Sequence, residues 1–345
     1  MPGNSNLHMS RSAKTDEFYT QLSLIESELS HYKKHFANKV VFCNCDDPYE
    51  SNFFKYFALN FNKLGLKKLI TTCYSGSPVT GKELGLFEDQ GKEYKITGKK
   101  AYKLVMSEFK DVNNDGRTDL DDVQEIIRHR IRYLKGDGDF RSTESIELLK
   151  EADIVVSNPP FSLFREYVAQ LMEFDKKFLV VGNQNAVTYK EIFPLIREDK
   201  VWLGYNNGHF WFKVPETYEE KKTDFKIDEN GQKWRRMGNI CWFTNLDIDK
   251  RHEEMILYQK YNTLDYPRYD NYNAIEVNRT NKIPCDYDGV MGVPITFMQY
   301  YNPKQFEILG TSRYHDGQEF ADDINFINGK GLYTRILIRR RQHED

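Results

Sequence analysis

Four consecutive residues, Asn158-Pro159-Pro160-Phe161, have the side chains in this sequence best suited to chemistry. They follow the apolar run 152–157, which predicts a buried strand because it is short, rich in β-branched residues and closed by a turn signal. Consecutive prolines have fixed φ angles and lack the backbone N–H, so they stiffen the loop, while Asn158 adds an amide oxygen. A rigid carbonyl, that oxygen and the Phe161 ring can together hold a planar amine. The alternative is a strand followed by an ordinary proline turn.

A second pattern with chemical potential is the acidic stretch 111–122, which fits a twelve-residue EF-hand calcium loop. Gly116 stands where the sharp turn needs glycine, but the last ligand position is Asp122 instead of the longer glutamate. The alternative is an Asx-rich turn that caps the next helix. The candidate calcium site consists of Asp111, Asn113, Asp115, Arg117, Asp119 and Asp122.

The elements around these motifs alternate between strands and helices from residue 38 to residue 205. Apolar runs predict strands at 40–43, 68–74, 103–106, 152–157, 178–183 and 201–205. Helical spacing predicts helices at 16–36, 53–61 after a Ser51 cap, 120–133, from Ser142 onward, 164–174 and 189–196. The alternation predicts an α/β fold with a doubly wound, mostly parallel sheet. In such sheets ligands bind at the carboxyl ends of the strands, where the Asn158 loop is expected to lie.

The region from residue 206 to residue 345 has a different composition, in which aromatic and basic residues are interleaved. Cations meet phosphates and amides read base edges, so this composition suits a nucleic-acid groove. The candidate DNA-binding residues are Lys233, Arg235 and Arg236. The alternative is a solvated, aromatic-rich accessory domain. The last apolar run, 335–341, predicts an edge strand with a basic tip.

The bulk composition places the chain among ordinary globular proteins. Of 345 residues, 39% are hydrophobic, which allows a sizeable core and argues against disorder. The net charge of −3 excludes a globally basic nucleic-acid binder, so any such contact must be local. Five cysteines without a C-x-x-C pair, and no apolar stretch of membrane-spanning length, predict a cytoplasmic protein without a membrane partner.

Taken together, the motifs resemble those of the adenine-specific DNA methyltransferases of the EcoRI modification-methylase type. The resemblance covers roughly 15–335 and rests on the order and spacing of several short segments. These are Asp16-Glu17-Phe18-Tyr19-Thr20, Asn44-Cys45-Asp46-Asp47-Pro48, Gly136-Asp137-Gly138-Asp139-Phe140, Asn158-Pro159-Pro160-Phe161, Gly292-Val293-Pro294 and Tyr301-Asn302-Pro303. The family implies the class I methyltransferase fold, S-adenosylmethionine as methyl donor and adenine N6 in duplex DNA as acceptor. Adenine must then leave the base stack to react.

The resemblance also assigns roles along the chain. Phe18, Tyr19 and Thr20 belong to an N-terminal piece that closes over the methionine end of the cofactor. We expect Asp46 or Asp47 to take the cofactor's ammonium group. The cofactor's adenine is then expected to meet Asp137 or Asp139, with Phe140 against its face. The usual glycine-rich turn is absent after strand 40–43, and Thr72-Cys73-Tyr74 stands where an acidic residue usually holds the ribose.

Three regions with separate tasks follow from this layout. Residues 1–37 form an N-terminal helical segment that closes over the cofactor, 38–205 the catalytic domain, and 206–345 the DNA target-recognition region. Double-stranded DNA is the expected partner, and a restriction endonuclease is a further candidate. The alternatives are methylation of another planar amine, in RNA adenine or a protein glutamine, and a non-catalytic DNA-binding protein on this fold.

Overall fold

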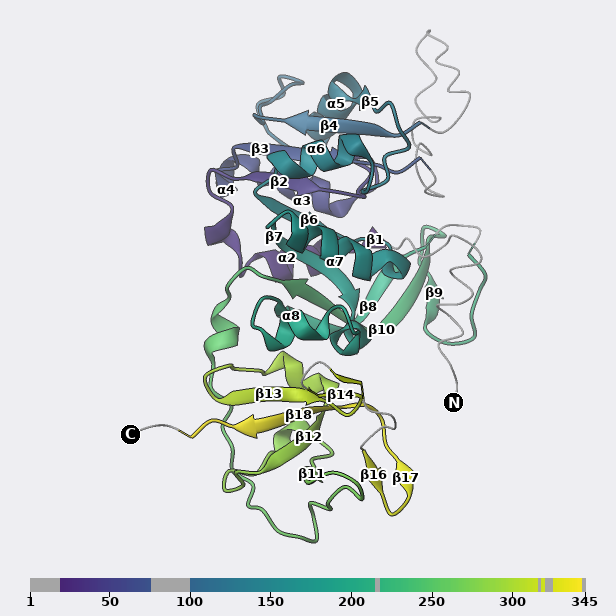
Figure 1. The fold of residues 1–345 in the computed structure, drawn as a ribbon. Coiled ribbons are helices and arrows are strands. Elements are labelled where there is room, and N and C mark those ends of the chain that lie inside the picture. Colours follow the sequence, from purple (N-terminus) through teal and green to yellow (C-terminus); the bar gives the residue numbers. More distant parts are fainter. Residues whose placement is uncertain (1–18, 76–99, 215–217, 316–317, 320–324, 343–345) are drawn as a thin grey trace. The chain divides into compact units, whose positions relative to one another are not determined.

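The computed structural model describes residues 19–75, 100–214, 218–315, 318–319 and 325–342, and it divides into two compact units (Figure 1). Unit 1 comprises 1–183 and 206–246, and unit 2 comprises 184–205 and 247–345. The division differs from the predicted boundary at residue 205, because 206–246 belongs to unit 1. The reason is strand pairing: β10 (Lys233–Thr244) pairs antiparallel with β7 (Lys177–Asn183) and so extends the sheet that contains β7.

The main sheet has four parallel strands at its centre, in the order β7, β6, β2 and β3. Antiparallel strands flank this centre, so the sheet as a whole is mixed, and the prediction of a mostly parallel α/β sheet is confirmed for the central strands. Besides β7 and β10 its strands are β1 (Tyr19–Thr20), β2 (Val40–Cys43), β3 (Lys68–Thr72), β4 (Tyr102–Met106), β5 (Arg132–Tyr133), β6 (Ile154–Ser157), β8 (Trp202–Lys213) and β9 (Phe225–Ile227).

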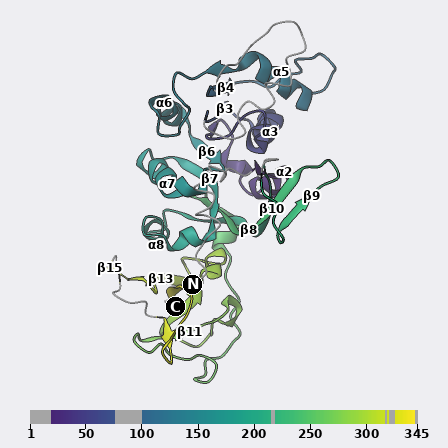
Figure 2. The same ribbon diagram turned by 90° about the vertical axis from the view of Figure 1, so that its right-hand side faces the viewer.

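Helices cover both faces of this sheet, as expected for a doubly wound fold. Figure 2 shows α6 and α7 on one face and α2, α3 and α5 on the other. The α-helices of this unit are α2 (Leu22–Leu29), α3 (Asn52–Leu59), α4 (Phe61–Leu64), α5 (Leu120–Arg130), α6 (Thr143–Glu151) and α7 (Phe164–Glu173), and the 3-10 helices are η1 (Lys33–His35) and η2 (Phe161–Leu163). Ser51 and Ser142 cap α3 and α6 as predicted.

Two helix predictions in unit 1 were wrong in part. In both, residues with helical spacing pair as strands with residues far away in the sequence. Tyr19 and Thr20 form β1 by pairing with Lys213 and Phe212 of β8, so the described part of the predicted helix 16–36 begins at Leu22. This helix, α2, ends at Leu29 and is followed by η1. The predicted helix 120–133 ends at Arg130, and the two following residues pair with β4. Local sequence pattern cannot anticipate such long-range pairing.

Unit 2 contains a second, smaller sheet with the strand order β11-β12-β18-β13-β14-β15. Its strands are β11 (Ala274–Glu276), β12 (Val290–Pro294), β13 (Phe306–Thr311), β14 (Tyr314–His315), β15 (Gln318–Glu319) and β18 (Arg335–Arg340), beside the separate hairpin of β16 (Phe326–Ile327) and β17 (Lys330–Gly331). Its helices are η3 (Gln184–Thr188), α8 (Phe193–Arg197), η4 (Asp249–His252), η5 (Thr280–Lys282) and η6 (Ile295–Gln299).

The predicted edge strand 335–341 was wrong in its position. β18 pairs with β12 on one side and with β13 on the other, so it lies inside the smaller sheet. Its apolar residues Ile336, Leu337 and Ile338 are fully buried, as a central strand requires.

The predicted helix 189–196 is shorter in the structure than expected, because η3 ends at Thr188 and α8 begins only at Phe193.

Candidate active site

The Asn158 loop leaves the end of β6 and turns at once into η2 and α7. The amide N–H of Leu163 donates to the Pro160 carbonyl at 2.9 Å, which closes a tight turn after the two prolines. Asn158 is partly exposed, but its side-chain oxygen is buried. Phe161 is 9% exposed, so only a small part of its ring reaches the surface. The loop therefore fixes an amide oxygen, a proline carbonyl and a ring at the carboxyl edge of the sheet.

The loop after β2 reaches the same edge, since β2 and β6 are adjacent parallel strands. Cys45 has φ +68°, a left-handed conformation that usually belongs to glycine. The chain therefore makes the sharp turn after β2 without a glycine. A cysteine in this conformation costs about 1–2 kcal/mol relative to glycine, which the surrounding hydrogen bonds must offset.

Both predicted carboxylates lie in this loop and are buried. Asp46 accepts hydrogen bonds from the hydroxyls of Ser51 at 2.8 Å and Ser157 at 2.7 Å. Asp47 accepts from the Tyr102 hydroxyl at 2.7 Å and from the Tyr49 amide at 3.0 Å. Burial, followed by the charge of Asp47, raises the pKa of Tyr102 far above its usual range, so this phenol stays a donor. Each carboxylate is thus fixed in orientation before any ligand arrives.

Hydroxyl groups at the ends of the neighbouring strands hold this loop in place. The Thr72 hydroxyl donates to Asn44 Oδ1 at 3.1 Å, the Thr71 hydroxyl donates to the Asp46 carbonyl, and the Ser157 hydroxyl contacts the Asn44 carbonyl. Asn44, Thr71, Thr72 and Ser157 are all completely buried. Sequence analysis missed these contributions of Asn44, Thr71 and Ser157. The available signal was a polar residue at the last positions of strands that are otherwise apolar.

The Gly-Asp turn, 136–140, packs against the end of β3. Gly138 has φ +80°, and a Cβ there would lie 2.1 Å from the Cys73 carbonyl oxygen, so only glycine fits. Asp139 is bound by Arg141, with Nη2 2.7 Å from Oδ2, and this ion pair lowers the pKa of Asp139. Asp137 is exposed and accepts the amide N–H of Asp139 at 3.0 Å. The turn therefore presents two carboxylates at the edge shared with β2 and β6.

Phe140 differs from the predicted cofactor-facing ring in being only 3% exposed. Its ring packs edge-on against Tyr167 of α7, with centroids 5.1 Å apart, and the Arg141 guanidinium lies 5.1 Å from its centroid. Gln170, also on α7, donates to the Phe140 carbonyl at 3.2 Å. The described structure thus joins the Gly-Asp turn to the helix that follows the Asn158 loop.

The N-terminal piece is described only from Tyr19, and Phe18 lies outside the described residues. Thr20 is buried, and its carbonyl accepts a hydrogen bond at 2.8 Å from the side chain of Asn52, the first residue of α3. Asn52 directly follows Ser51, which binds Asp46. The structure therefore brings Thr20 to the same neighbourhood as the β2 loop.

Buried polar atoms at this edge fit a polar ligand. Within the described residues, Thr20 Oγ1, Asn44 Nδ2 and the Tyr167 hydroxyl are buried and have no hydrogen-bond partner. Burial, helped by the nearby charge of Asp46, raises the pKa of the Tyr167 hydroxyl well above its usual range, and the adjacent Ser157 side chain partly opposes this. A buried polar group without a partner costs about 1–3 kcal/mol. Donors and acceptors of this kind suit a ligand with ammonium, carboxylate and hydroxyl groups, such as S-adenosylmethionine.

The predicted DNA-binding cations lie on an arm formed by β9 and the first half of β10, which extends from the sheet on the side away from α7 (Figure 2). Arg236 Nε donates to Asp224 Oδ1 at 2.6 Å, and Arg235 donates to the Asp224 carbonyl at 3.0 Å. Lys233 Nζ donates to the Tyr218 carbonyl at 3.2 Å. All three predicted cations therefore contact the segment 218–224, which precedes β9.

Two tryptophans, Trp211 of β8 and Trp234 of the arm, lie beside Lys226, and the sequence analysis did not name either of them as a DNA-binding residue. Lys226 Nζ lies 4.7 Å from the ring centroid of Trp211 and 5.9 Å from that of Trp234. The Trp234 indole donates to Asp228 at 2.8 Å, which fixes its orientation. Rings and cations at such distances attract one another, and both can also contact a nucleic acid.

The acidic loop 111–122 uses its carboxylates on its own backbone. Asp111 accepts the N–H groups of Asn114 and Gly116, at 2.6 and 2.8 Å. Asp119 and Asp122 form a capping box at the start of α5. Among the described residues no cluster of three His, Cys, Asp or Glu side chains has the arrangement of a metal site. The predicted Asx-rich capping turn is therefore formed, and calcium binding stays a prediction.

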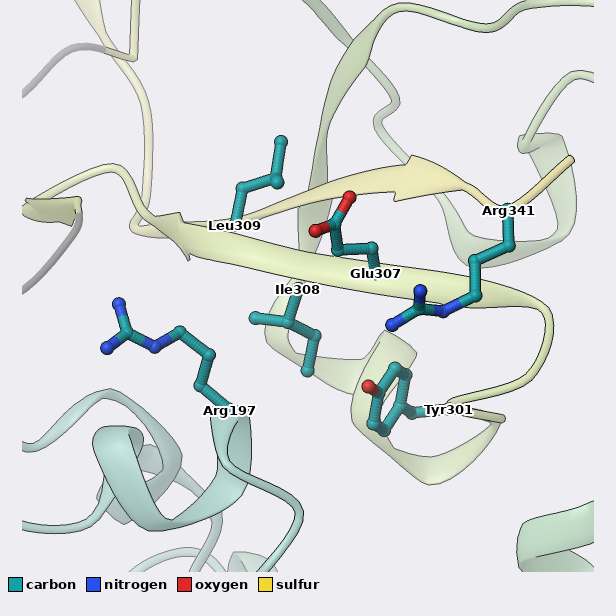
Figure 3. Close-up of a pocket in the computed structure, with 6 residues that line it drawn as sticks. All are labelled: Arg197, Tyr301, Glu307, Ile308, Leu309 and Arg341. Carbon is teal, nitrogen blue, oxygen red and sulfur yellow. The ribbon is translucent and has the colours of Figure 1, made fainter.

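Unit 2 has a separate cavity of about 400 Å³ with two guanidinium groups in its wall (Figure 3). Arg197 comes from the end of α8 and Arg341 directly follows β18, whereas Tyr301 lies below Arg341 in this view. Arg341 Nε donates to the Pro303 carbonyl at 2.8 Å, which holds its side chain at the rim. The remaining lining residues are Glu307, Ile308 and Leu309 of β13.

Comparison with known proteins places this architecture in a family. A family model described as adenine-specific methyltransferase EcoRI matches residues 6–341. The chain is 48% identical to the type II methyltransferase M.EcoRI of Escherichia coli, over 98% of this chain and 97% of that protein. It is 37% identical to M.MgeORF184P of Mycoplasma genitalium, over 98% and 99% of the two chains, and 36% identical to M.MpnI of Mycoplasma pneumoniae, over 96% and 97%.

No solved structure gives a significant match to the chain. Among the described residues, no helix is both long and apolar enough to cross a membrane. The matched family model spans all the segments that carry the active-site motifs, from the N-terminal strand to the end of the smaller sheet. The chain therefore belongs to the EcoRI family of adenine-specific DNA methyltransferases.

Proposed function

We propose that this DNA methyltransferase transfers a methyl group from S-adenosylmethionine to N6 of an adenine extruded from a specific duplex sequence. The observation that carries the proposal is the meeting of two loops at one sheet edge. The Asn158 loop offers oxygen acceptors for an amine, and the adjacent β2 loop offers the buried carboxylates Asp46 and Asp47. The Ser157–Asp46 hydrogen bond of 2.7 Å joins the two.

Asn158 and Pro159 act on the amine. The exocyclic nitrogen of adenine is a poor nucleophile because its lone pair is delocalised into the ring. Asn158 Oδ1 and the Pro159 carbonyl accept its two N–H bonds, which favours a pyramidal nitrogen with a localised lone pair. The same oxygens stabilise the positive charge that develops on nitrogen during the transfer. Pro160 contributes by stiffening the loop, so that these acceptors need little reorganisation.

Residues around the β2 loop hold the donor. When bound, S-adenosylmethionine supplies a methyl group on a positively charged sulfur, which needs no further activation. Asp46 or Asp47 pairs with its ammonium group, and Asp137 or Asp139 accepts from its adenine amine. Phe18, Tyr19 and Thr20 close over its methionine end. Phe140 packs against the face of the cofactor's adenine, and its own ring is held by an edge-on contact with Tyr167.

Phe161 holds the extruded adenine. Taking a base out of the stack costs a few kcal/mol, and stacking on an aromatic ring returns about 1–3 kcal/mol. Phe161 lies two positions after Pro159 in the sequence and begins η2. Its exposed fraction of 9% means that the neighbouring side chains must move slightly for a base to cover the ring.

The basic groups position the duplex. On the arm, Lys233, Arg235 and Arg236 exchange their internal partners for phosphates. For Arg236 the cost is small, because its exposed ion pair with Asp224 is worth about 0–1 kcal/mol. Arg197 and Arg341 of unit 2 supply a second place for a backbone phosphate. A restriction endonuclease that cuts the same sequence is the partner expected of a type II modification enzyme.

Mapping modified bases in the DNA of a host that expresses the chain tests this function. Long-read sequencing should show N6-methyladenine at one short sequence motif, and the same host with the Asn158→Ala variant should lack it. Absence of any modified motif with the wild-type chain, despite soluble and folded protein, would contradict the proposal. Methyl groups at cytosine would contradict it as well.

A further inference from the structure

One side chain connects the two loops of the proposed active site. Ser157 is the last residue of β6 and directly precedes Asn158. Its hydroxyl lies 2.7 Å from Asp46 Oδ2 and also contacts the Asn44 carbonyl. Ser157 is completely buried, so water does not compete for these contacts. The backbone that carries the acceptor amide is therefore attached, one residue away, to a carboxylate expected to bind the cofactor.

The chemistry of this contact makes it sensitive to charge. A serine hydroxyl has one hydrogen to donate, and here two acceptors compete for it. A carboxylate is the stronger acceptor, so the hydrogen goes to Asp46 as long as that carboxylate has few other donors. An ammonium group that pairs with Asp46 weakens this bond and frees the hydrogen for the Asn44 carbonyl. The hydrogen bond of the Ser157 hydroxyl thus has a different acceptor when the cofactor is bound at Asp46 than when it is absent.

Tyr167 provides a third group at the same junction. It lies on α7, which begins at Phe164 after the Asn158 loop, and its side chain is completely buried. Its hydroxyl lies close enough to Ser157 for that side chain to lower its pKa, but the two hydroxyls do not reach the geometry of a full hydrogen bond. A small shift of the loop would give this hydroxyl a partner. The junction therefore has an alternative arrangement available to it, built from groups that are already in place.

We propose that Ser157 is a positioning residue that couples cofactor binding at Asp46 to the arrangement of the Asn158 loop. This inference rests on the proposed function. The cofactor then strengthens binding of target DNA, and DNA strengthens binding of the cofactor by the same factor, because coupling free energies are reciprocal. Ser157 does not touch the reacting atoms in this account and acts only through Asp46 and Asn158.

Thr72 offers a matched control. Its hydroxyl is equally buried and donates to the side chain of Asn44 at 3.1 Å, so it also supports the β2 loop. It lies on β3 instead of β6, and within the described part of the chain its hydroxyl donates to Asn44 and not to the Asn158 loop. Loss of the Thr72 hydroxyl should therefore weaken the cofactor site without changing the coupling.

The test measures binding of sinefungin, a non-transferable analogue of the cofactor, by calorimetry on the full chain. Each protein is titrated with and without a duplex that contains the mapped target sequence. We expect DNA to tighten sinefungin binding about tenfold in the wild type and in Thr72→Val, and less than about threefold in Ser157→Ala. Ser157→Cys, which keeps a weak donor of similar size, should fall between them. Circular dichroism and melting temperature check that each variant is folded.

The outcomes separate this inference from the proposed function. If the wild type binds neither sinefungin nor duplex, the proposed function fails. If the wild type binds both and Ser157→Ala keeps the wild-type ratio, the function stands and the coupling role of Ser157 is refuted. A ratio near one in the wild type would also refute it, and an equal loss of the ratio in Thr72→Val would show a general structural effect instead.

Discussion

The carboxylates of the β2 loop, at the carboxyl edge of the main sheet, are buried, whereas the ion pair of Arg236 on the β9–β10 arm is exposed. At the edge, Asp46 and Asp47 are buried and held by hydroxyl donors on fixed elements. On the arm, Arg236 and its partner Asp224 are exposed, with side-chain exposures of 45% and 36%. Buried groups of this kind keep one geometry, whereas exposed pairs exchange partners easily. The difference suits chemistry at the edge and sliding contact with phosphates on the arm.

The largest effect should come from the acceptor at the edge. We expect Asn158→Ala to lower the rate of a single turnover about 10²–10³-fold, because one acceptor for the developing charge is lost. Binding of sinefungin should stay within about threefold of the wild type, since Asn158 is not assigned to the cofactor. Transfer of a tritiated methyl group to target DNA measures the rate. Asn262→Ala, in an exposed turn of unit 2, is the control, and a near-wild-type rate for Asn158→Ala would refute the assignment.

The buried carboxylate comes next. Asp46→Asn keeps the size of the side chain but removes its charge, and charge-assisted hydrogen bonds are worth about 1.5–3 kcal/mol. We therefore expect the Kd of sinefungin to rise about 10–100-fold in calorimetry. Asp265→Asn, an exposed change of the same type, should have no effect. If Asp46→Asn binds sinefungin normally while Asp47→Asn does not, the ammonium group belongs to Asp47.

Phe161→Ala tests the ring at the edge. Loss of stacking of about 1–3 kcal/mol should reduce the signal of a fluorescent adenine analogue at the target position and slow methyl transfer about 5–100-fold. Cofactor binding should not change. Leu163→Ala truncates a partly exposed apolar residue two positions later and serves as the control. Normal extrusion of the analogue by Phe161→Ala would remove the ring from the mechanism.

Substitutions on the β9–β10 arm should change the affinity for duplex DNA and leave the rate of methyl transfer unchanged. Each phosphate contact contributes about 0.9 to the slope of log K against log salt for duplex DNA. Arg236→Ala should thus lower that slope by about one and weaken binding of target and unrelated duplexes alike. Lys63→Ala, on α4 of the same unit, is the control. An unchanged slope would show that Arg236 keeps Asp224 as its partner on DNA.

The smallest effect concerns the acidic loop, which resembles the edge in having fixed carboxylates but faces solvent. Asp119→Ala removes the cap of α5 and should lower the free energy of unfolding by about 1 kcal/mol without changing methyl transfer. Arg117→Ala, in the same loop, should have little effect on stability. A rise of the wild-type melting temperature with calcium, absent from Asp119→Ala, would show that the loop binds the metal.

Much of the carboxyl edge of the main sheet could be predicted, because short local sequence patterns identify its strands and loops. Apolar runs located β2, β3, β6 and β7, and the two prolines located the loop after Ser157. The support network could not be predicted, since the contacts of Ser157 with Asp46 and of Tyr102 with Asp47 join residues 111 and 55 positions apart. The same limit explains why β1 and the central position of β18 were missed: both depend on distant strands.

The arm shows a different limit. The sequence pointed to the basic residues at 233–236 but predicted no strand there, and the acidic partner of Arg236, Asp224, lies twelve positions away in the chain. A count of charges along the sequence cannot show which cations are already paired. The backbone of Cys45 could not be predicted either. Its left-handed conformation explains how the β2 loop turns without glycine, but nothing about a cysteine in the sequence indicates that conformation.

A crystal structure of the full chain with sinefungin and its target duplex tests the central claim most directly. We predict an adenine outside the base stack, with its N6 within about 2.7–3.2 Å of both Asn158 Oδ1 and the Pro159 carbonyl and its ring on Phe161. An adenine that remains stacked in the duplex, or an N6 atom held by other residues while Asn158 stays in the protein interior, would contradict the account.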